Sequence, residues 1–192
     1  MTRVAGIVLA AGSARRMGRD KRLEKVGGVP MVLLAVEAAL GAGLDPVVVV
    51  TGPEPLALLP ATVAAVANPA PERGMASSLA LGVAALPEDA GAVVVLLADM
   101  PRVAAAHVDA LTRAFDPAAG HEIAVPVHGG RRGNPVLLGR RFFAEMRGLT
   151  GDKGARGLLV QHAALVAEVE CDDAVLMDVD TPEDLKMVEP GS

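Results

Sequence analysis

Residues 4–12 read VAGIVLAAG, an apolar run broken only by Gly6 and closed by a turn of small residues. Two more apolar runs, at residues 47–50 and 93–98, end at the turn-forming sequences TGP and DMP. Apolar runs without polar alternation are typical of strands buried on both faces, as in the parallel sheet of an α/β protein. The pattern therefore predicts a single three-layer α/β/α domain with a mostly parallel, Rossmann-like sheet.

The rest of the chain alternates between helix-like and strand-like segments, with no linker or internal repeat. We expect further strands at residues 123–127, 135–138 and 175–179, loops at 53–60 and 69–74, and helices at 31–40, 77–86, 104–115, 141–147, 154–162 and 182–188. Gly41, Gly43 and Pro87 follow the first two helices and are typical stop signals. The predicted domain covers residues 1–188, and residues 189–192 are a short C-terminal tail.

Composition narrows the function classes. The 192-residue chain is 52% hydrophobic and carries a formal net charge of -5, so we expect no nucleic-acid partner. Cys171 is the single cysteine, which excludes an intramolecular disulfide and a cysteine-cluster metal site and fits a cytoplasmic location. No apolar run approaches the roughly eighteen residues of a membrane helix, so we expect no membrane segment and interpret residues 4–10 as a buried strand, not a secretory signal.

A cluster of cations follows the turn at Gly12, with basic side chains at Arg15, Arg16, Arg19, Lys21, Arg22 and Lys25. The backbone N–H groups of a small-residue turn can approach a phosphate chain without obstruction by side chains. A strand, a glycine turn and a local excess of cations in an acidic chain favour a polyphosphate site over the alternative of a solvated charged loop. The spacing matches neither the Walker A loop nor the dinucleotide fingerprint.

Residues 9–21, LAAGSARRMGRDK, resemble the nucleotidyltransferase signature LAAGxxxRMG with a Lys shortly after it. The sequence DMP at 99–101 resembles the metal-binding motif of these enzymes, and NP at 68–69 with GMASSL at 74–79 resembles their base-binding segment. The sequences RGNPV at 132–136, GDKGAR at 151–156 and DVDTPED at 178–184 are similar to the molybdenum cofactor cytidylyltransferase branch of the MobA-like family. The chain departs from that branch at Asn134, where His is common, and at Leu9, where Thr is frequent.

The resemblance implies transfer of CMP from CTP to the phosphate of molybdopterin, a phosphorylated pterin, with release of pyrophosphate and with a molybdoenzyme as a further partner. It implies a nucleotide site at Leu9, Ala10, Ala11, Gly12, Ser13, Lys21, Asn68, Ser78 and Asp99, in which Arg16, Lys21 and Asp99 are catalytic. It also implies an acceptor site at Arg132, Asn134, Lys153 and Arg156, and a Mg²⁺ ion held by Asp99 and Asp180.

The chemistry of these residues supports parts of that assignment. Mg²⁺ takes one or two protein carboxylates and completes its shell with phosphate oxygens and water, which suits Asp99 at a strand end, with Asp178 a weaker second candidate than Asp180. Lys153 and Arg156 stand beside glycines at a predicted helix start, where anions bind readily. Turn and cap roles are the alternatives: Asp99 precedes Pro101, and Thr181 with Pro182 reads equally well as the start of the last helix.

A phosphate monoester has its second pKa near 6, so the acceptor is already anionic at pH 7 and the reaction needs no general base. Catalysis then reduces to alignment and charge neutralisation. This explains a site without a catalytic triad, and the scattered His107, His121, His128 and His162 show no metal-binding spacing.

The base preference and the acceptor remain open to alternatives at this level. Guanylyl-transferring relatives carry Gly-Gly where this chain has Ala11-Gly12, so Ala11 narrows the base pocket and favours cytosine, although one methyl group is worth only about 1–3 kcal/mol of discrimination. The alternative enzymes use GTP or another NTP, or another phosphorylated acceptor. The alternative of another class is a chaperone that delivers the pterin cofactor to a molybdoenzyme without catalysis.

Overall fold

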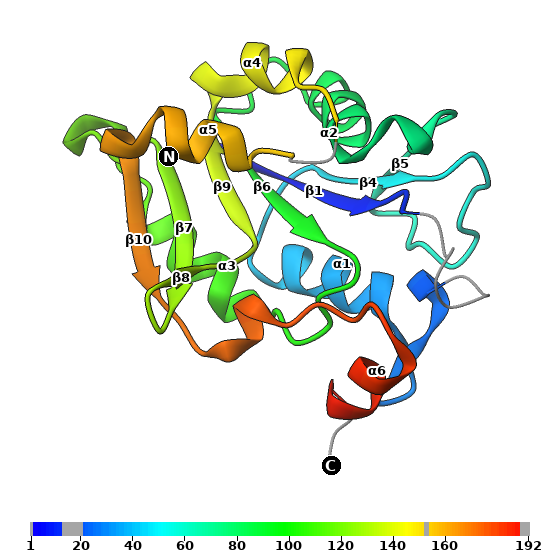
Figure 1. Cartoon of the computed structure of the whole chain (residues 1–192). Helices are drawn as coiled ribbons and strands as arrows, with labels where there is room; N and C mark the ends of the chain where they lie inside the picture. The colour runs from blue at the N-terminus through cyan, green and yellow to red at the C-terminus, as the bar shows by residue number, and fades with distance from the viewer. Residues whose placement is uncertain (1, 13–20, 152–153, 189–192) are drawn as a thin grey trace.

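A computed structural model describes residues 2–12, 21–151 and 154–188 (Figure 1). Within these ranges the main sheet has eight strands in the order β10-β7-β9-β6-β1-β4-β5, with β8 paired to β7. The strands are β1 Val4–Ala10, β4 Val47–Thr51, β5 Ala64–Ala67, β6 Ala92–Leu97, β7 Ile123–His128, β8 Arg131–Arg132, β9 Val136–Gly139 and β10 Val166–Glu170. The short strands β2 Lys25–Val26 and β3 Val29–Pro30 form a separate hairpin.

The centre of the sheet is parallel. Strand β1 pairs in parallel with β4 and β6, β4 pairs in parallel with β5, and β10 pairs in parallel with β7. Strand β9 alone among the long strands of the described chain runs the other way, and it pairs antiparallel with both β6 and β7. The expected mostly parallel sheet is confirmed.

Helices cover both faces of this sheet, as Figure 1 shows. They are α1 Met31–Gly41, α2 Met75–Ala84, α3 Ala105–Ala114, α4 Phe143–Gly148, α5 Arg156–Gln161 and α6 Pro182–Val188. Neighbouring residues of β1 point to opposite faces, so Val8 packs in one core with α1 and α3, whereas Ile7 packs in the other with α2, α4 and α5. Burial of the strands on both faces explains their unbroken apolar sequence.

Close packing holds α2 against the sheet. A Cβ atom on Gly82 would lie 2.9 Å from Cγ2 of Ile7 and 3.1 Å from Cγ2 of Val50. The absence of a side chain at Gly82 therefore lets the helix backbone approach β1 and β4. A smaller cluster of Val26, Met31, Val179 and Val188 fixes α6 against the start of α1.

One expected strand was wrong, and two observed strands were missed. Residues 175–179 are not a strand: Asp172 accepts a hydrogen bond from the N–H of Ala174 at 3.0 Å, and the chain turns through a 3₁₀ helix at Asp173–Leu176. The last strand is β10, which the apolar pattern did not reveal because it lies at the sheet edge with Glu168 and Glu170 exposed. The other edge strand, β5, was also missed: its residues are apolar but mostly exposed, and three of the four are alanine, a residue depleted in strands.

In the part of the chain that the structure describes, no helix has both the length and the apolar character needed to span a membrane.

Candidate functional site

The carboxyl ends of β1 and β6 meet at one edge of the sheet, where a cavity of about 310 Å³ opens. The N–H of Ala98 donates to the carbonyl oxygen of Leu9 at 3.1 Å, which ties the two strand ends together. This nucleotide-side cavity, as we call it, is lined by the two strand ends, by the start of α2 and by Arg22: Leu9, Ala10, Ala11, Gly12, Arg22, Pro71, Gly74, Met75, Ser78, Leu97, Ala98 and Asp99. The first turn and the acidic tip of β6 therefore face the same space.

Arg22 is a site residue that the sequence analysis counted only as part of a cation cluster. Its side chain is half-buried, lines the nucleotide-side cavity and donates from Nη1 to the carbonyl oxygen of Ala10 at 2.6 Å. The hydrogen bond fixes a positive charge under the first turn. The only signal in the sequence was its membership of the cluster, because Ala10 and Arg22 stand twelve positions apart and their contact leaves no local pattern.

Several expected site residues lie outside the described structure. They are Ser13, Arg16 and Lys153, together with the side chain of Lys21, whose backbone belongs to the short 3₁₀ helix Lys21–Leu23. Their assignments stay predictions from sequence.

Asn68 does not line the nucleotide-side cavity, where it was expected to contact base or ribose. Its amide is buried and donates to the hydroxyl oxygens of Ser77 and Ser78, both at 2.9 Å, while its Oδ1 accepts from the N–H of Ala70 at 2.9 Å. With these bonds made, Asn68 orients the start of α2, and Ser78 is the residue that reaches the cavity.

Asp99 and the turn before α6 lie next to each other. The N–H of Val179 donates to the carbonyl oxygen of Asp99 at 2.8 Å, which places Asp180 one residue from that contact. The capping alternative for the turn is also realised: Thr181 Oγ1 accepts from the N–H of Asp184 at 3.2 Å, and the Asp184 carboxylate accepts from the N–H of Thr181 at 2.8 Å. The side chains of Thr181 and Asp184 make this cap, and the Asp180 side chain is not part of it.

The described residues fit a divalent cation that takes few ligands from the protein. Among residues 2–12, 21–151 and 154–188 no group of three or more His, Cys, Asp or Glu side chains is arranged to hold a metal. Mg²⁺ is bound by one or two carboxylates together with substrate phosphates and water, and Asp99 supplies such a carboxylate on the cavity wall.

A second cavity of about 650 Å³ adjoins the first, and Leu9, Met75 and Leu97 line both. We call it the acceptor-side cavity, since three of the four residues expected to bind the acceptor line it: Arg132, Asn134 and Arg156. Most of its remaining wall is apolar, with Leu79, Val95, Val136, Leu159 and Val160 among the lining residues.

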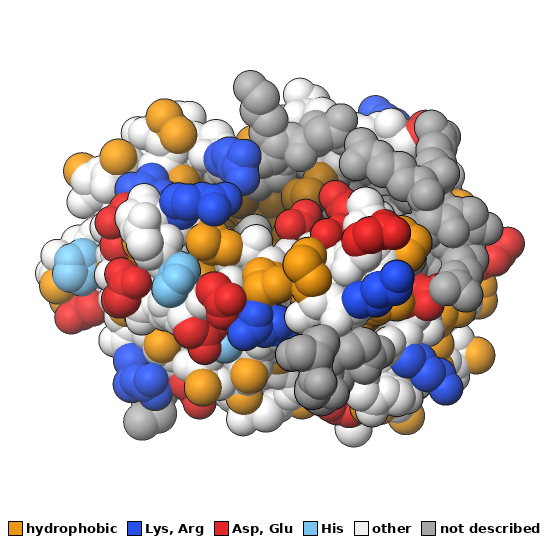
Figure 2. Space-filling view, turned by 60° about the horizontal axis from the view of Figure 1, so that its bottom comes forward, with side chains coloured by type: hydrophobic (Ala, Val, Ile, Leu, Met, Phe, Trp, Pro, Cys, Tyr) orange, Lys and Arg blue, Asp and Glu red, His pale blue; other side chains and the backbone are white. Residues whose placement is uncertain are grey.

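Both basic and acidic residues line the acceptor-side cavity. Arg132 is steadied by Glu168 of β10, with its Nε 2.8 Å from the carboxylate, and Arg156 is exposed at the start of α5. Asp178 supplies an acidic group on the same wall, which the sequence analysis considered only as a weaker metal ligand. Figure 2 shows this side of the molecule, where basic and acidic side chains gather on opposite sides of a hollow.

Three of the four histidines contact other residues of the fold through their side chains. His107 pairs with Asp172, His162 pairs with Glu145, and His128 contacts the carbonyl oxygen of Cys171. None of the four lines either cavity.

Comparison with known proteins places the chain among nucleotidyltransferases. The model of the "MobA-like NTP transferase domain" matches residues 6–182. Purine catabolism protein PucB of Bacillus subtilis is 33% identical across 95% of this chain and 94% of its own length. Nicotine blue oxidoreductase of Paenarthrobacter nicotinovorans is 32% identical with the same coverage, and a probable molybdenum cofactor guanylyltransferase of Synechococcus elongatus is 33% identical over 55% of each chain.

Solved structures show the same architecture. The crystal structure of Rv0371c from Mycobacterium tuberculosis has a TM-score of 0.85 and 30% identity over 97% of both chains. The structure of Rv0371c in complex with manganese has a TM-score of 0.81 and 28% identity, again over 97% of both chains.

Proposed function

The chain belongs to the MobA-like NTP transferase family, and from that membership we propose that it transfers CMP from CTP to the phosphate of molybdopterin and releases pyrophosphate. One observation carries the proposal: the nucleotide-side and acceptor-side cavities are contiguous, sharing the walls formed by Leu9, Met75 and Leu97. A nucleoside triphosphate and a large phosphorylated acceptor can therefore lie end to end at the carboxyl edge of the sheet.

In the proposed reaction, an oxygen of the acceptor phosphate attacks the α-phosphorus of CTP. The bond from that phosphorus to the bridging oxygen of the β-phosphate breaks, and pyrophosphate leaves with the bonding electrons. The attacking phosphate is anionic at neutral pH, so no proton has to be removed from it. The protein's task is to align the two reactants and to offset negative charge.

The first turn and the cations around it serve the triphosphate. Gly12 is exposed on the cavity wall, where its N–H is accessible to phosphate, and Ser13 follows it. Arg22 fixes one positive charge beneath the turn, and Arg16 and Lys21 add charge from the neighbouring sequence. Mg²⁺ held by Asp99, with Asp180 as a second ligand, would neutralise phosphate charge when bound.

The base is recognised at the start of α2 and at Ala11. Ser78 lines the nucleotide-side cavity, and its hydroxyl accepts a hydrogen bond from Asn68. Ala11, directly after the end of β1, is buried and lines the same cavity. Compared with glycine at this position, the methyl group of Ala11 reduces the room for a base, which supports cytosine over the larger guanine.

The acceptor-side cavity suits a flat ring system that carries an anionic group. Its apolar wall offers contact area to a ring, whereas Arg132, Arg156 and Lys153 can bind phosphate. Asn134 takes the place of the histidine that is common in the cytidylyltransferase branch. The similarity to a probable molybdenum cofactor guanylyltransferase also supports a pterin acceptor.

The test measures pyrophosphate release with CTP, GTP, ATP and UTP in turn, with molybdopterin as the acceptor and Mg²⁺ or Mn²⁺ as the metal. We expect CTP to be the preferred donor, and Ala11→Gly to shift the ratio of kcat/KM from CTP towards GTP by about tenfold. Preference of the wild type for GTP would contradict the role of Ala11. Tight binding of the pterin without pyrophosphate release would instead support a cofactor chaperone, and turnover only with another phosphorylated acceptor would identify a different transferase.

A further inference from the structure

Residues 171–180 form a segment without strand or long helix, which we call the C-terminal strap. It leaves the end of β10 at the edge of the sheet and runs along the carboxyl ends of the strands to the start of α6 (Figure 1). A single four-residue 3₁₀ helix, Asp173–Leu176, is its only regular element. Its position therefore depends on contacts with the rest of the chain.

The strap touches both halves of the candidate site. The carbonyl oxygen of Val175 accepts from the N–H of Asn134 at 2.9 Å, and the N–H of Val179 donates to the carbonyl oxygen of Asp99 at 2.8 Å. Asp178, between these two contacts, lines the acceptor-side cavity. A shift of the strap would thus move the wall that faces the acceptor.

The backbone contact beside Asn134 is tight. A Cβ atom on Gly133 would lie 2.1 Å from the carbonyl oxygen of Val175, closer than any real contact, so the strap can cross here only over a glycine. The main chain beside the acceptor-side cavity and the main chain of the strap are therefore in direct contact.

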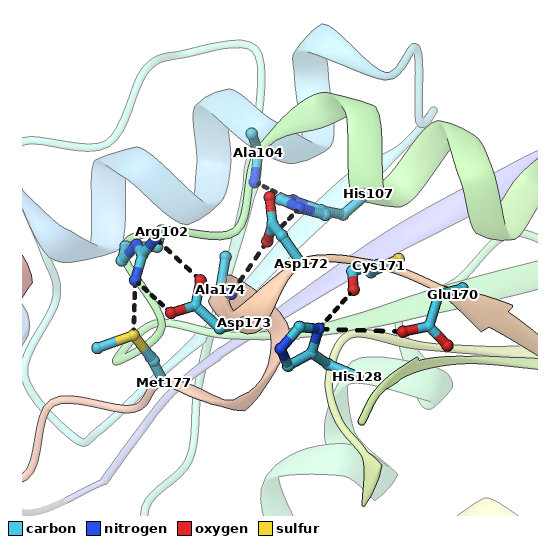
Figure 3. Close-up of polar contacts among 10 residues, drawn as sticks. All are labelled: Arg102, Ala104, His107, His128, Glu170, Cys171, Asp172, Asp173, Ala174 and Met177. Atoms are coloured by element: carbon cyan, nitrogen blue, oxygen red, sulfur yellow. Dashed lines mark hydrogen bonds and ion pairs between the residues drawn. The ribbon is translucent and has the colours of Figure 1, made fainter. Parts of the chain in front are cut away.

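Two side chains outside the strap, those of Arg102 and His107, contact it, as Figure 3 shows. Arg102 is close to Asp99 in sequence, and its guanidinium pairs with both carboxylate oxygens of Asp173 at 3.0 and 3.2 Å and donates to the sulfur of Met177. His107 on α3 pairs with Asp172 through Nε2 at 3.2 Å, while its Nδ1 accepts from the N–H of Ala104 at 2.9 Å. Nδ1 as acceptor leaves the proton of a neutral ring on Nε2, directed at the carboxylate.

From this geometry we propose that Arg102 is a positioning residue for the acceptor: by holding Asp173 and Met177 it fixes the strap, and through Val175 and Asp178 it fixes the wall on which the acceptor binds. The inference rests on the proposed function for the identity of the acceptor. Arg102 lines neither cavity, so its effect on the acceptor is indirect. It spans 71 sequence positions to reach Asp173, which makes it a second link between the Asp99 loop and the strap, beside the hydrogen bond from Val179 to Asp99.

The test compares Arg102→Ala with Arg3→Ala. Arg3 is a matched control because its side chain is 38% exposed against 37% for Arg102, and it also pairs with carboxylates, those of Asp45 and Asp89. Equilibrium binding of molybdopterin and of CTP with Mg²⁺ is measured separately by calorimetry, so that the result does not depend on turnover. We expect Arg102→Ala to raise the Kd for molybdopterin about three- to fivefold, because a partly exposed ion pair contributes little energy. The Kd for CTP should change by less than about twofold. In Arg3→Ala the Kd for molybdopterin should not rise in this way.

Cys171 provides a second readout that is independent of ligand. It is the single cysteine of the chain and stands at the first position of the strap. Its alkylation by iodoacetamide, measured at a pH above the titration midpoint of the thiol, should be severalfold faster in Arg102→Ala than in the wild type or Arg3→Ala. Arg102→Lys keeps a cation beside Asp173 and should restore part of both effects, and Asp173→Asn should reproduce them without adding to Arg102→Ala.

The outcomes separate this inference from the proposed function. Equal alkylation in Arg102→Ala and Arg3→Ala, or faster alkylation with an unchanged Kd for molybdopterin, would overturn the positioning role. A wild-type protein that binds no molybdopterin would overturn the proposed acceptor and, with it, the role of Arg102 towards that acceptor. The alkylation rates would then still decide whether Arg102 holds the strap.

Discussion

The N–H of Ala98 lies 3.1 Å from the carbonyl oxygen of Leu9 and donates a hydrogen bond to it, just beyond the last residue of β6. The bond extends the β1–β6 pairing past the end of the strand and holds the Asp99 loop beside the first turn. Both strands are buried at the centre of the sheet, so this juxtaposition is set by the core of the fold. Asp99 and the first turn thereby line one cavity.

Asp99→Asn should remove most metal-dependent transfer while the protein stays folded. The substitution keeps the shape of the side chain and removes the negative charge that would hold the cation. We expect kcat/KM to fall by about two to three orders of magnitude, since the neutralisation of phosphate charge is worth several kcal/mol. The measurement is pyrophosphate release, with thermal unfolding recorded in parallel and the distant, exposed Asp89→Asn as control. Transfer at a near-normal rate in Asp99→Asn would leave that carboxylate without a metal role.

Asn68→Ala should affect both stability and nucleotide binding. The change removes three hydrogen bonds of a buried amide and leaves Ser78 without its fixed partner. A free energy of unfolding lower by about 2–3 kcal/mol and a severalfold weaker affinity for CTP follow from these losses. Chemical denaturation and calorimetry provide the measurements. Ser77→Ala is the control, because it removes one of the three contacts and keeps Ser78 in place; equal effects of the two substitutions would argue against a role for Asn68 through Ser78.

Gly82→Ala should destabilise the protein although alanine favours helix formation. The new methyl group would press on Ile7 and Val50, which are fully buried in the sheet and have little room to yield. We expect a net loss of about 1–2 kcal/mol in the free energy of unfolding, after the gain in helix propensity is counted.

Gly157→Ala is the matched substitution on α5. No atom lies within 4 Å of the position that its Cβ would take, and the residue is exposed, so the change should stabilise by about 0.5 kcal/mol. Urea denaturation of the two variants measures the contrast, and a Gly82→Ala protein as stable as the wild type would show that α2 can move away from the sheet.

The thiol of Cys171 should ionise only at a higher pH than ordinary cysteine. Burial raises the pKa of Cys171, and the negative charges of Asp172 and Glu170 raise it further. At pH 8 to 9 the thiolate fraction is then smaller than in the unfolded chain, so alkylation is slower and its pH profile has a higher midpoint. Iodoacetamide rates in buffer and in denaturant measure both midpoints. Coincident midpoints would mean that the folded environment does not act on this thiol.

The parts of the fold that sequence predicts well are those buried on both sides. Strand β1 was predicted with its observed bounds, because only a strand covered on both faces readily accommodates an unbroken apolar run of this length between turns. The edge strands β5 and β10 escaped prediction for different reasons: β5 is a short, mostly exposed run with alanine at three of its four positions, whereas β10 is interrupted by the exposed Glu168 and Glu170. Val175 and Val179 produced the opposite error: both are buried, yet they anchor an irregular segment and belong to no strand.

The same distinction applies to the candidate site. Asp99 and Asn134 stand in motifs of adjacent residues, so sequence alone places them at the correct edge of the sheet. Arg22 and Arg102 gain their roles from contacts with Ala10 and Asp173, which are distant in sequence. Such contacts leave no local pattern, and only the folded chain displays them.

The reversed direction of β9 gives the two cavities walls from different parts of the sheet. Because β9 runs against β6, its first residues emerge beside the tip of β6, and the hairpin leading into it can contribute Arg132 and Asn134 to the substrate. The ends of the parallel strands β1 and β6 line the nucleotide-side cavity, and no residue of that hairpin is among its lining residues. Under the proposed function, changes in residues 129–135 and in the strap would alter the acceptor-side cavity, whereas the nucleotide-side cavity would keep its lining.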